Sequence, residues 1–475
     1  MKVLLVEDNP STIAEVTTAL EKDDIEIIVA RSQTLALDAL SNGTTYDLIV
    51  CDLRIPTQDP DGEAMDEFGA SVLAMVTRDH PGTPCIIFSA FMRLDNVGDF
   101  LTNAPQGDIY GNREEHPLVR RMEKDELRLF CETVLEIHAE LRRLEDIEIP
   151  RERGTISLSR EHERVLRLAA RRLGGDVVRV RPLSGGRSGA SVFRADVRLP
   201  DGSSARMVAK ISSHSEIREE LTRYQRHLAG ILTEGTYAPL VDEIRYGAGA
   251  WGGVFYRLAE TSEDTAFTWL ATHADQGSAL VSAIRELASP WHRNPPTVRR
   301  TVGDIRRKQV DDDRLATYAT SLDALGWRDF ERRTITYLET CQHQDLHGGN
   351  VLVKPTGQPL LIDYGDVGPG PSPMDPVTLE LSLVFHPDSS AASSGWPTTD
   401  QCRAWANLDQ FVAGCPFESF VRACRDWAFE SANVGERVVY AVAYAYALRQ
   451  LKYPGTDSLK ALAIAEAAMA TYSAL

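Results

Sequence analysis

The sequence predicts an α/β protein, in which a doubly wound parallel sheet is followed by a larger α+β part with a helical C-terminal region. In the first 145 residues short apolar runs alternate with helical stretches, the order typical of a parallel sheet. Further on, a glycine-rich turn joins two strand-like runs, and from about residue 400 the pattern is helical. With 475 residues, the chain is long enough for two or three domains.

The composition excludes several classes of protein. No stretch approaches the roughly 18 uncharged residues of a membrane span, and the first apolar run is too short for a signal peptide, so we expect a cytoplasmic protein without a membrane partner. The seven cysteines form no CxxC pair, which disfavours a zinc ribbon. Residues 1–150 hold 30 acidic and 13 basic side chains, hence −17 of the net −18, so we expect no nucleic-acid partner.

Four apolar runs in the first part are predicted strands, at residues 2–6, 25–30, 48–51 and 85–88. Ligands of such sheets bind beyond the carboxyl ends of the strands, and polar side chains lie there: Glu7, Asp8, Asp52 and Ser89. Gathered carboxylates repel one another, and a divalent metal relieves this while leaving one carboxylate able to attack phosphorus. The pattern indicates aspartyl phosphate chemistry.

At these positions the segment resembles a response-regulator receiver domain with a CheY-like sheet. The resemblance rests on EDN at 7–9, VCDLRIP at 50–56 and FSA at 88–90. It implies that Asp52 accepts a phosphoryl group from a cognate histidine kinase or a small phosphodonor, that Glu7, Asp8 and Asp52 hold Mg²⁺, and that Ser89 bonds the phosphate. The alternative is a degenerate receiver whose acidic pocket serves only for docking.

Two departures from the receiver pattern stand out. The stretch TQDPDGEAM, at 57–65, lengthens the loop beside Asp52. In addition, the family's lysine at the end of the fifth strand has no evident counterpart, and we expect Arg120, in PLVRRMEKDEL, to take its place or the position to be lost. Arginine differs from lysine in bulk and geometry, so this substitution bears on phosphorylation.

A helical stripe connects the two parts of the chain. Apolar residues recur every three or four positions through 123–145, on a helix that packs against its own sheet or continues as a coiled linker, so that a homodimer stays open as an alternative. Pro150 and Gly154 break the pattern. We therefore expect a receiver over residues 1–145, a linker over 146–156 and a second domain over 157–475.

The second part begins with features suited to phosphate. The turn LSGGRSGASVFRADV (183–197) would bring backbone N–H groups to phosphates through Gly185, Gly186, Ser188 and Gly189. Lys210 ends the next strand, and the helix after it contains Glu220, which we prefer to Glu219 as the ion-pair partner of Lys210. The alternative is that the turn is an ordinary hairpin and that both glutamates are solvated surface residues.

The stretches CQHQDLHGGNVLV (341–353) and LLIDYGD (360–366) predict a β-hairpin with oxygen-bearing side chains at one end. Val351–Val353 and 359–362 read as strands, and residues 355–358 supply the turn. Asp345 and Asn350 precede the first strand and Asp363 follows the second. This convergence suits a hard cation. A zinc site formed by His343, Asp345, His347 and Asp363 is the less favoured alternative.

The glycine-rich turn, the strand lysine, the helix glutamate, CQHQDLHGGNVLV and LLIDYGD follow one another along the chain. In this order they resemble the aminoglycoside phosphotransferase and choline kinase branch of the protein-kinase-like fold. The resemblance implies a bilobal domain, with an N-lobe at about 175–260 and a C-lobe at about 261–475. It also implies ATP and Mg²⁺ as cofactors, Asp345 as the catalytic residue, and Asn350 and Asp363 as Mg²⁺ ligands. Gln344 stands where the family has glycine. Residues 262–340 fit the family poorly.

The sequence therefore predicts an ATP- and Mg²⁺-dependent phosphotransferase regulated by aspartyl phosphorylation of its receiver, with a small molecule or a protein as the phosphoryl acceptor. One alternative is an inactive kinase-like scaffold that binds a nucleotide or a partner. Another is a small-molecule resistance kinase whose activity does not depend on Asp52.

Overall fold

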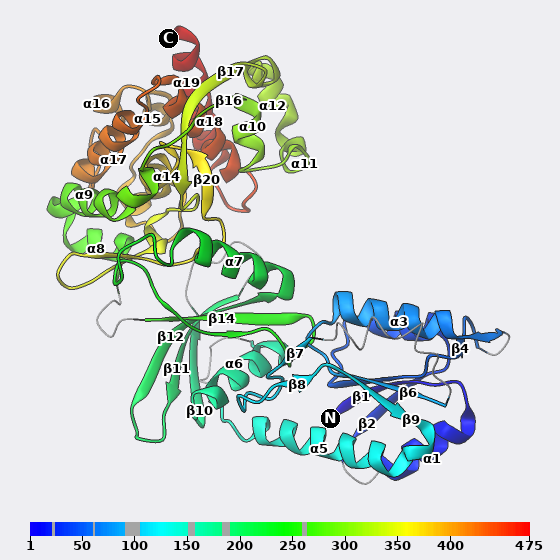
Figure 1. Cartoon of the computed structure of the whole chain (residues 1–475). Helices are drawn as coiled ribbons and strands as arrows, with labels where there is room; N and C mark the ends of the chain where they lie inside the picture. Colours follow the sequence, from blue (N-terminus) through cyan, green and yellow to red (C-terminus); the bar gives the residue numbers. More distant parts are fainter. Residues whose placement is uncertain (21–23, 60–61, 91–104, 151–156, 183–190, 259–263) are drawn as a thin grey trace. The chain divides into compact units, whose positions relative to one another are not determined.

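The computed structural model describes the chain except for residues 21–23, 60–61, 91–104, 151–156, 183–190 and 259–263 (Figure 1). The chain divides into two compact units. The first unit comprises Met1–Arg218 and Leu240–Leu258, and the second comprises Glu219–Pro239 and Ala259–Leu475. The receiver part and the next sheet thus share one unit, whereas the predicted boundary lies between them.

The first sheet contains five parallel strands in the order β2-β1-β3-β6-β9. This confirms the predicted doubly wound sheet. The strands are β1 (Lys2–Val6), β2 (Glu26–Ala30), β3 (Leu48–Cys51), β6 (Cys85–Ser89) and β9 (Val119–Glu123). Among the described residues, the helices of this part are α1 (Pro10–Leu20), α2 (Gln33–Ser41), α3 (Asp66–Asp79) and α5 (Leu127–Glu145), the last preceded by a 3₁₀ turn at Lys124–Glu126.

Both faces of this sheet are buried, because successive side chains of a strand point to opposite faces. Val3 and Leu5 pack with α1 and α5, whereas Leu4 and Val6 pack with α2 and α3. Figure 1 shows α3 on one side of the sheet and α5 with α1 on the other. Beside Asp52, the short strand β4 (Ile55–Pro56) pairs with β5 (Ala64–Met65), which ends the inserted stretch. A second short pair joins β7 (Gln106–Gly107) to β8 (His116–Pro117).

The second sheet of the first unit is antiparallel, in the order β10-β11-β12-β14-β13. Its strands are β10 (Val177–Pro182), β11 (Ser191–Arg198), β12 (Ser204–Ser213), β13 (Leu240–Ile244) and β14 (Trp251–Arg257). Helix α6 (Arg160–Arg172) packs on this sheet and also on α5. One hydrophobic core runs from receiver residues such as Phe130 through Val165 and Leu168 of α6 to Phe255. The receiver is therefore packed onto the second sheet.

The second unit is mainly helical and contains two small sheets, in the orders β15-β18-β19 and β16-β17-β20. The strands are β15 (Asp264–Thr265), β16 (Thr297–Thr301), β17 (Thr334–Gln342), β18 (Val351–Val353), β19 (Pro359–Leu361) and β20 (Gly368–Pro371). Helix α7 (His214–His227) contains the division between the units. The described helices of the second unit are α8 (Ala266–Thr272), α9 (Gly277–Ala288), α10 (Val302–Arg307), α11 (Asp312–Leu315), α12 (Ala319–Ala324), α13 (Trp327–Glu331), α14 (Met374–Phe385), α15 (Thr399–Arg403), α16 (Leu408–Phe411), α17 (Glu418–Ser431), α18 (Arg437–Gln450) and α19 (Ser458–Ala474).

Helix α18 is the centre of the second unit. Every residue from Val438 to Gln450 is buried, because α10, α14 and α19 all contact the helix. A helix buried on all sides has no polar face. The aromatic residues of this helix, Tyr440, Tyr444 and Tyr446, are therefore core residues. In the described part of the chain no helix is both long and apolar enough to cross a membrane.

Candidate functional site

Three carboxylates gather at the carboxyl ends of the first two central strands. Glu7 and Asp8 follow β1, Asp52 follows β3, and these strands are neighbours with Val6 opposite Cys51. One oxygen of each carboxylate lies within 4.8 Å of the others. Among the residues that the structure describes, this is the only such group of three potential metal ligands. All-oxygen donors of this kind fit Mg²⁺.

Lys124 lies directly against these carboxylates. Its Nζ is 2.5 Å from Oδ2 of Asp52 and 2.6 Å from Oε2 of Glu7. The assignment of the family's lysine to Arg120 is therefore wrong, because Arg120 stands within β9, opposite Ile86, whereas Lys124 follows the end of that strand. The sequence signal was the Lys124-Asp125 pair at the end of PLVRRMEKDEL, and it was missed because β9 extends as far as Glu123.

The pocket is short of positive charge. The Glu7 side chain is 1% exposed, and this burial raises the pKa of its carboxyl, which Lys124 lowers only in part. Burial alone would lower the pKa of Lys124, but its bonds to Asp52 and Glu7 raise it above the ordinary value, so Lys124 stays protonated. One ammonium faces three carboxylates, and a bound divalent cation would balance the remaining charge.

The turn at Asp52 is fixed by its backbone and by a glycine. The Asp52 amide donates to the carbonyl of Val6, and the Arg54 amide donates to Oδ1 of Asp52 at 3.2 Å. Gly69 of α3 lies against this turn, so that a Cβ there would come within 2.5 Å of the Asp52 carbonyl oxygen. Ser89 ends β6, opposite Glu123, and is buried at the same edge of the sheet. Glu7, Asp8, Asp52 and Ser89 thus share one edge of the sheet.

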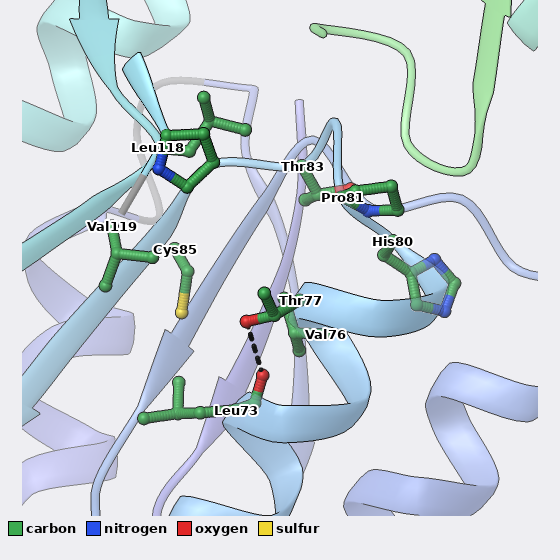
Figure 2. A pocket seen from close by; sticks show the side chains of 10 residues that line it. Leu73, Val76, Thr77, His80, Pro81, Thr83, Cys85, Leu118 and Val119 are labelled. Carbon is green, nitrogen blue, oxygen red and sulfur yellow. Dashed lines mark hydrogen bonds between the residues drawn. The ribbon is translucent and has the colours of Figure 1, made fainter. Parts of the chain in front are cut away.

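A small apolar hollow in the same sheet lies away from this edge. Figure 2 shows it between α3 and the amino ends of β6 and β9, with Val76, Cys85 and Val119 in its lining. Its volume is about 30 Å³, which is space for a water molecule rather than a substrate. It is therefore no part of the candidate site.

In the second unit, the predicted hairpin is present. Strands β18 and β19 pair with Val351 opposite Leu361, and the Lys354 amide donates to the Gln358 carbonyl across the turn. The preceding loop is tied to the end of the hairpin, since the Ile362 amide donates to the Asn350 carbonyl. The Asn350 amide group in turn donates to the Asp345 carbonyl at 2.9 Å. The structure thus brings Asp345, Asn350 and the segment before Asp363 together.

His343 braces this loop. Its Nε2 lies 3.0 Å from the Ile362 carbonyl oxygen, and because a carbonyl only accepts, this ring nitrogen carries the hydrogen. Among the described residues, His343, Asp345, His347 and Asp363 do not bring three ligand atoms within 4.8 Å of one another. Asp363 has a φ of 61° and Gln344 a φ of 65°, both in the left-handed region that is uncommon for residues with a side chain.

Sequence reasoning missed Asp375, which anchors the Asp345 loop by accepting two of its backbone N–H groups. Asp375, in the first turn of α14, accepts the backbone N–H groups of His343 at 2.7 Å and Gln344 at 2.9 Å. Burial raises the pKa of this carboxyl to about 6, although His343 and both amides lower it. An aspartate in the first turn of a helix gives no signal in the sequence that distinguishes an anchor from a capping residue.

Sequence reasoning also missed Arg449, which contacts Asp345. The Nη2 of Arg449, on α18, is 2.7 Å from Oδ1 of Asp345. Burial by itself raises the pKa of the Asp345 carboxyl, but Arg449 and then His347 hold it well below its usual range. Asp345 is therefore an anion. His347 accepts the Gly349 amide at Nδ1, and its Nε2 is 3.7 Å from Oδ2 of Asp345.

Tyr364, in the IDYGD segment, is buried and well connected. Its hydroxyl accepts the Ala238 amide at 2.7 Å and donates to the Leu361 carbonyl at 2.5 Å. Its ring lies 5.8 Å from that of Tyr224 on α7 and 6.4 Å from that of His343. The segment that contains Asp363 is thus fixed from two sides.

The predicted nucleotide-binding residues are placed only in part. Gly185, Gly186, Ser188 and Gly189 lie outside the described residues. Lys210 is buried in β12, opposite Val192 and Val254, and belongs to the first unit. Glu220 is buried in α7 and belongs to the second unit, so its pairing with Lys210 stays a prediction.

Comparison with known proteins bears on two parts of the chain. Residues 3–106 match the model of the response regulator receiver domain, and residues 175–294 match the model of ternary complex associated domain 9. The comparison with curated proteins gave no match.

Several solved receiver structures are similar to the N-terminal part. A CheY-like receiver domain protein from Methanospirillum hungatei is 16% identical, over 30% of this chain and 97% of that one, with a TM-score of 0.22. A response regulator from Thermotoga maritima is 20% identical over 29% and 97%, with a TM-score of 0.22. The receiver domain of the Francisella response regulator 1452 is 25% identical over 30% and 97%, with a TM-score of 0.21.

The parallel sheet, its acidic edge and the family match define the N-terminal part as an α/β signalling domain. More particularly, it is a response-regulator receiver domain. A receiver domain implies two-component-type signalling and a phosphodonor such as a histidine kinase.

Proposed function

We propose that Asp52 accepts a phosphoryl group, and that this controls an ATP- and Mg²⁺-dependent phosphotransferase in the C-terminal part. The observation that carries the first step is the contact of Lys124 with both Asp52 and Glu7. A lysine in this position can pair with phosphoryl oxygens once the Asp52 carboxylate is phosphorylated to an acyl phosphate. The acidic group without it would only bind a cation.

Each receiver residue has a separate role in the proposed phosphoryl transfer. An Asp52 oxygen attacks the phosphorus of the donor, and the bond from phosphorus to the donor's leaving atom breaks. Mg²⁺ held by Glu7, Asp8 and Asp52 would supply positive charge for the phosphoryl oxygens. Lys124 and Ser89 are the protein's own groups for holding the product, the first by charge and the second by its hydroxyl.

The phosphotransferase proposal rests on the loop around Asp345. In support of it, the Asp345 loop is tied through Asn350 to the end of the hairpin before Asp363, and it is fixed by His343 and Asp375. Asp345 would orient the acceptor hydroxyl, and the oxygens of Asn350 and Asp363 would hold Mg²⁺ beside ATP. The assignment of Lys210, Glu220 and the glycine-rich turn to the phosphates of ATP stays a prediction from the sequence.

The route from receiver to phosphotransferase is proposed through α6. Because the receiver, α6 and the sheet that contains Lys210 share one core, a change at Asp52 has a packed path into that sheet. The alternatives are a nucleotide-binding scaffold without turnover and a phosphotransferase indifferent to its receiver. A homodimer is a further prediction that the single chain leaves untested.

One set of measurements separates these proposals. The full chain is incubated with Mg²⁺ and acetyl phosphate, and phosphoprotein is resolved by phosphate-affinity electrophoresis, with Asp52→Asn as the control. We expect a phosphorylated band in the wild type alone. ATP turnover is then measured with and without beryllofluoride. Turnover that changes in the wild type but not in Asp52→Asn supports regulation, equal turnover supports an indifferent receiver, and no turnover supports a scaffold.

A further inference from the structure

Arg449 connects the Asp345 loop to a part of the chain that the family resemblance leaves unexplained. Its Nη2 donates to Oδ1 of Asp345 at 2.7 Å, and its Nη1 lies 3.3 Å from both the Gln344 carbonyl oxygen and Oε1 of Gln309. Gln309 follows α10, in the segment IRRKQVDDDR. One guanidinium thus joins three points: α18, the end of α10 and the Asp345 loop.

The guanidinium is fixed in place by its surroundings. The Arg449 side chain is 9% exposed and projects from a helix that is buried on all sides. Gln309 is also buried, and its amide lies 3.6 Å from the sulfur of Met374, next to the loop anchor Asp375. An arginine held by three acceptors loses little further freedom when it orients a carboxylate.

The exposure of the carboxylate distinguishes this pair from two structural ones in the same unit. Arg306 binds Glu331 and Arg425 binds Glu380, each through two nitrogens, and those carboxylates are 5% and 0% exposed. Asp345 is 26% exposed although its arginine is buried. A pair that only stabilised the core would have no need for an accessible carboxylate.

We propose that Arg449 is the positioning residue of the transfer site, which holds Oδ1 of Asp345 so that Oδ2 faces the acceptor. This inference rests on the proposed phosphotransferase function. Oδ2, which lies 3.7 Å from Nε2 of His347, would accept the hydrogen bond of the acceptor hydroxyl. As the acceptor oxygen bonds to the γ-phosphorus of ATP, the bond from that phosphorus to the β,γ-bridging oxygen breaks, ADP leaves, and the hydroxyl proton passes through Oδ2 to solvent. Gln309 supports Arg449 from the other side.

The test uses the full chain with Mg²⁺·ATP, and water as the phosphoryl acceptor, to compare Arg449→Gln with Arg449→Lys. Because positioning acts on the chemical step, we expect Arg449→Gln to lower kcat by about 10- to 100-fold with the KM for ATP within twofold of wild type. Lysine keeps the charge but cannot reach all three acceptors, so Arg449→Lys should recover part of the loss. Gln309→Leu should lower kcat less than Arg449→Gln does.

A matched control is Arg422→Gln on α17, since Arg422 pairs with two exposed carboxylates away from this loop. It should leave kcat and KM at wild-type values. Wild-type kcat in Arg449→Gln overturns the inference and leaves the phosphotransferase standing. The inference is also overturned if kcat falls equally in Arg449→Gln and Arg449→Lys and if circular dichroism shows a matching loss of folded protein. If the wild type itself shows no turnover, the proposed function fails, and the inference fails with it.

Discussion

Asp47 and Arg164 form a buried ion pair that fastens the receiver to the rest of its unit. Oδ1 of Asp47 lies 3.0 Å from Nη2 of Arg164, and Oδ2 lies 2.6 Å from Nη2 of the more exposed Arg160. Asp47 directly precedes β3, the strand whose other end leads to Asp52, and both arginines are on α6. The strand that leads to the phosphoacceptor therefore has its amino end fixed to the helix that packs on the second sheet.

The ion pair of Asp47 and Arg164 predicts that the stability of the protein depends on pH. Burial raises the pKa of Asp47, but the two arginines outweigh it and hold the pKa below its usual value. A depressed pKa in the folded state contributes stability above the unfolded-state value of about 3.9, and this stability is lost as the pH falls through the folded-state value. In urea unfolding of the full chain, we expect Asp47→Asn to lose about 3–5 kcal/mol at pH 7 and less at pH 3.

Arg160→Gln is the control for this prediction, because the Arg160 side chain is 45% exposed and contributes about 0–1 kcal/mol. A loss in Asp47→Asn that is the same at both pH values would contradict the assigned role of charge.

Lys124 predicts a metal-dependent stability of the receiver. Lys124→Gln removes the one ammonium between Glu7 and Asp52, so these carboxylates repel each other and the melting temperature without Mg²⁺ should fall. Added Mg²⁺ should raise the melting temperature of Lys124→Gln more than that of the wild type. The wild type and Arg120→Gln, whose side chain stands elsewhere on β9, should respond alike. A response in Arg120→Gln that matches Lys124→Gln would contradict the role of Lys124 as the cation of this pocket.

The close packing of Gly69 predicts that Gly69→Ala destabilises the protein, whereas the same substitution in an exposed helix stabilises it. Gly→Ala within a helix ordinarily stabilises by about 0.5–1 kcal/mol. Here a Cβ would meet the Leu53 carbonyl oxygen at 2.3 Å, and backbone atoms cannot move aside cheaply. Gly69→Ala should therefore destabilise by about 1–3 kcal/mol and reduce phosphorylation of Asp52 by acetyl phosphate. Stabilisation in thermal unfolding would show that α3 does not press on this turn.

The loop around Asp345 predicts a separation of chemistry from binding. Asp345→Asn should lower kcat by roughly 10²–10⁴-fold with ATP affinity almost unchanged, as for a residue that acts on the acceptor hydroxyl. Asp363→Asn should abolish turnover by removing a ligand charge for Mg²⁺. Isothermal titration with a nonhydrolysable ATP analogue checks the binding. A large loss of affinity in Asp345→Asn would make Asp345 a metal ligand instead.

The sequence by itself determined the strands and the residues at their ends. Alternation of apolar runs with helices is a local property, so the parallel sheet and the positions of Glu7, Asp8 and Asp52 followed from it. The hairpin at 351–361 was predictable for the same reason, since two short runs and a turn contain its whole pattern.

Only the tertiary structure decided which distant charges meet. Lys124 faces Asp52 across 72 positions of sequence, Arg164 reaches Asp47 across 117, and Arg449 reaches Asp345 across 104. Such pairs depend on how helices pack on sheets, and the packing follows from the sum of many apolar contacts that are individually weak. A charged residue near the end of a strand or in a helix looks the same in sequence whether it meets solvent or a buried carboxylate. For this reason Lys124, Asp375 and Arg449 had to be located by the fold.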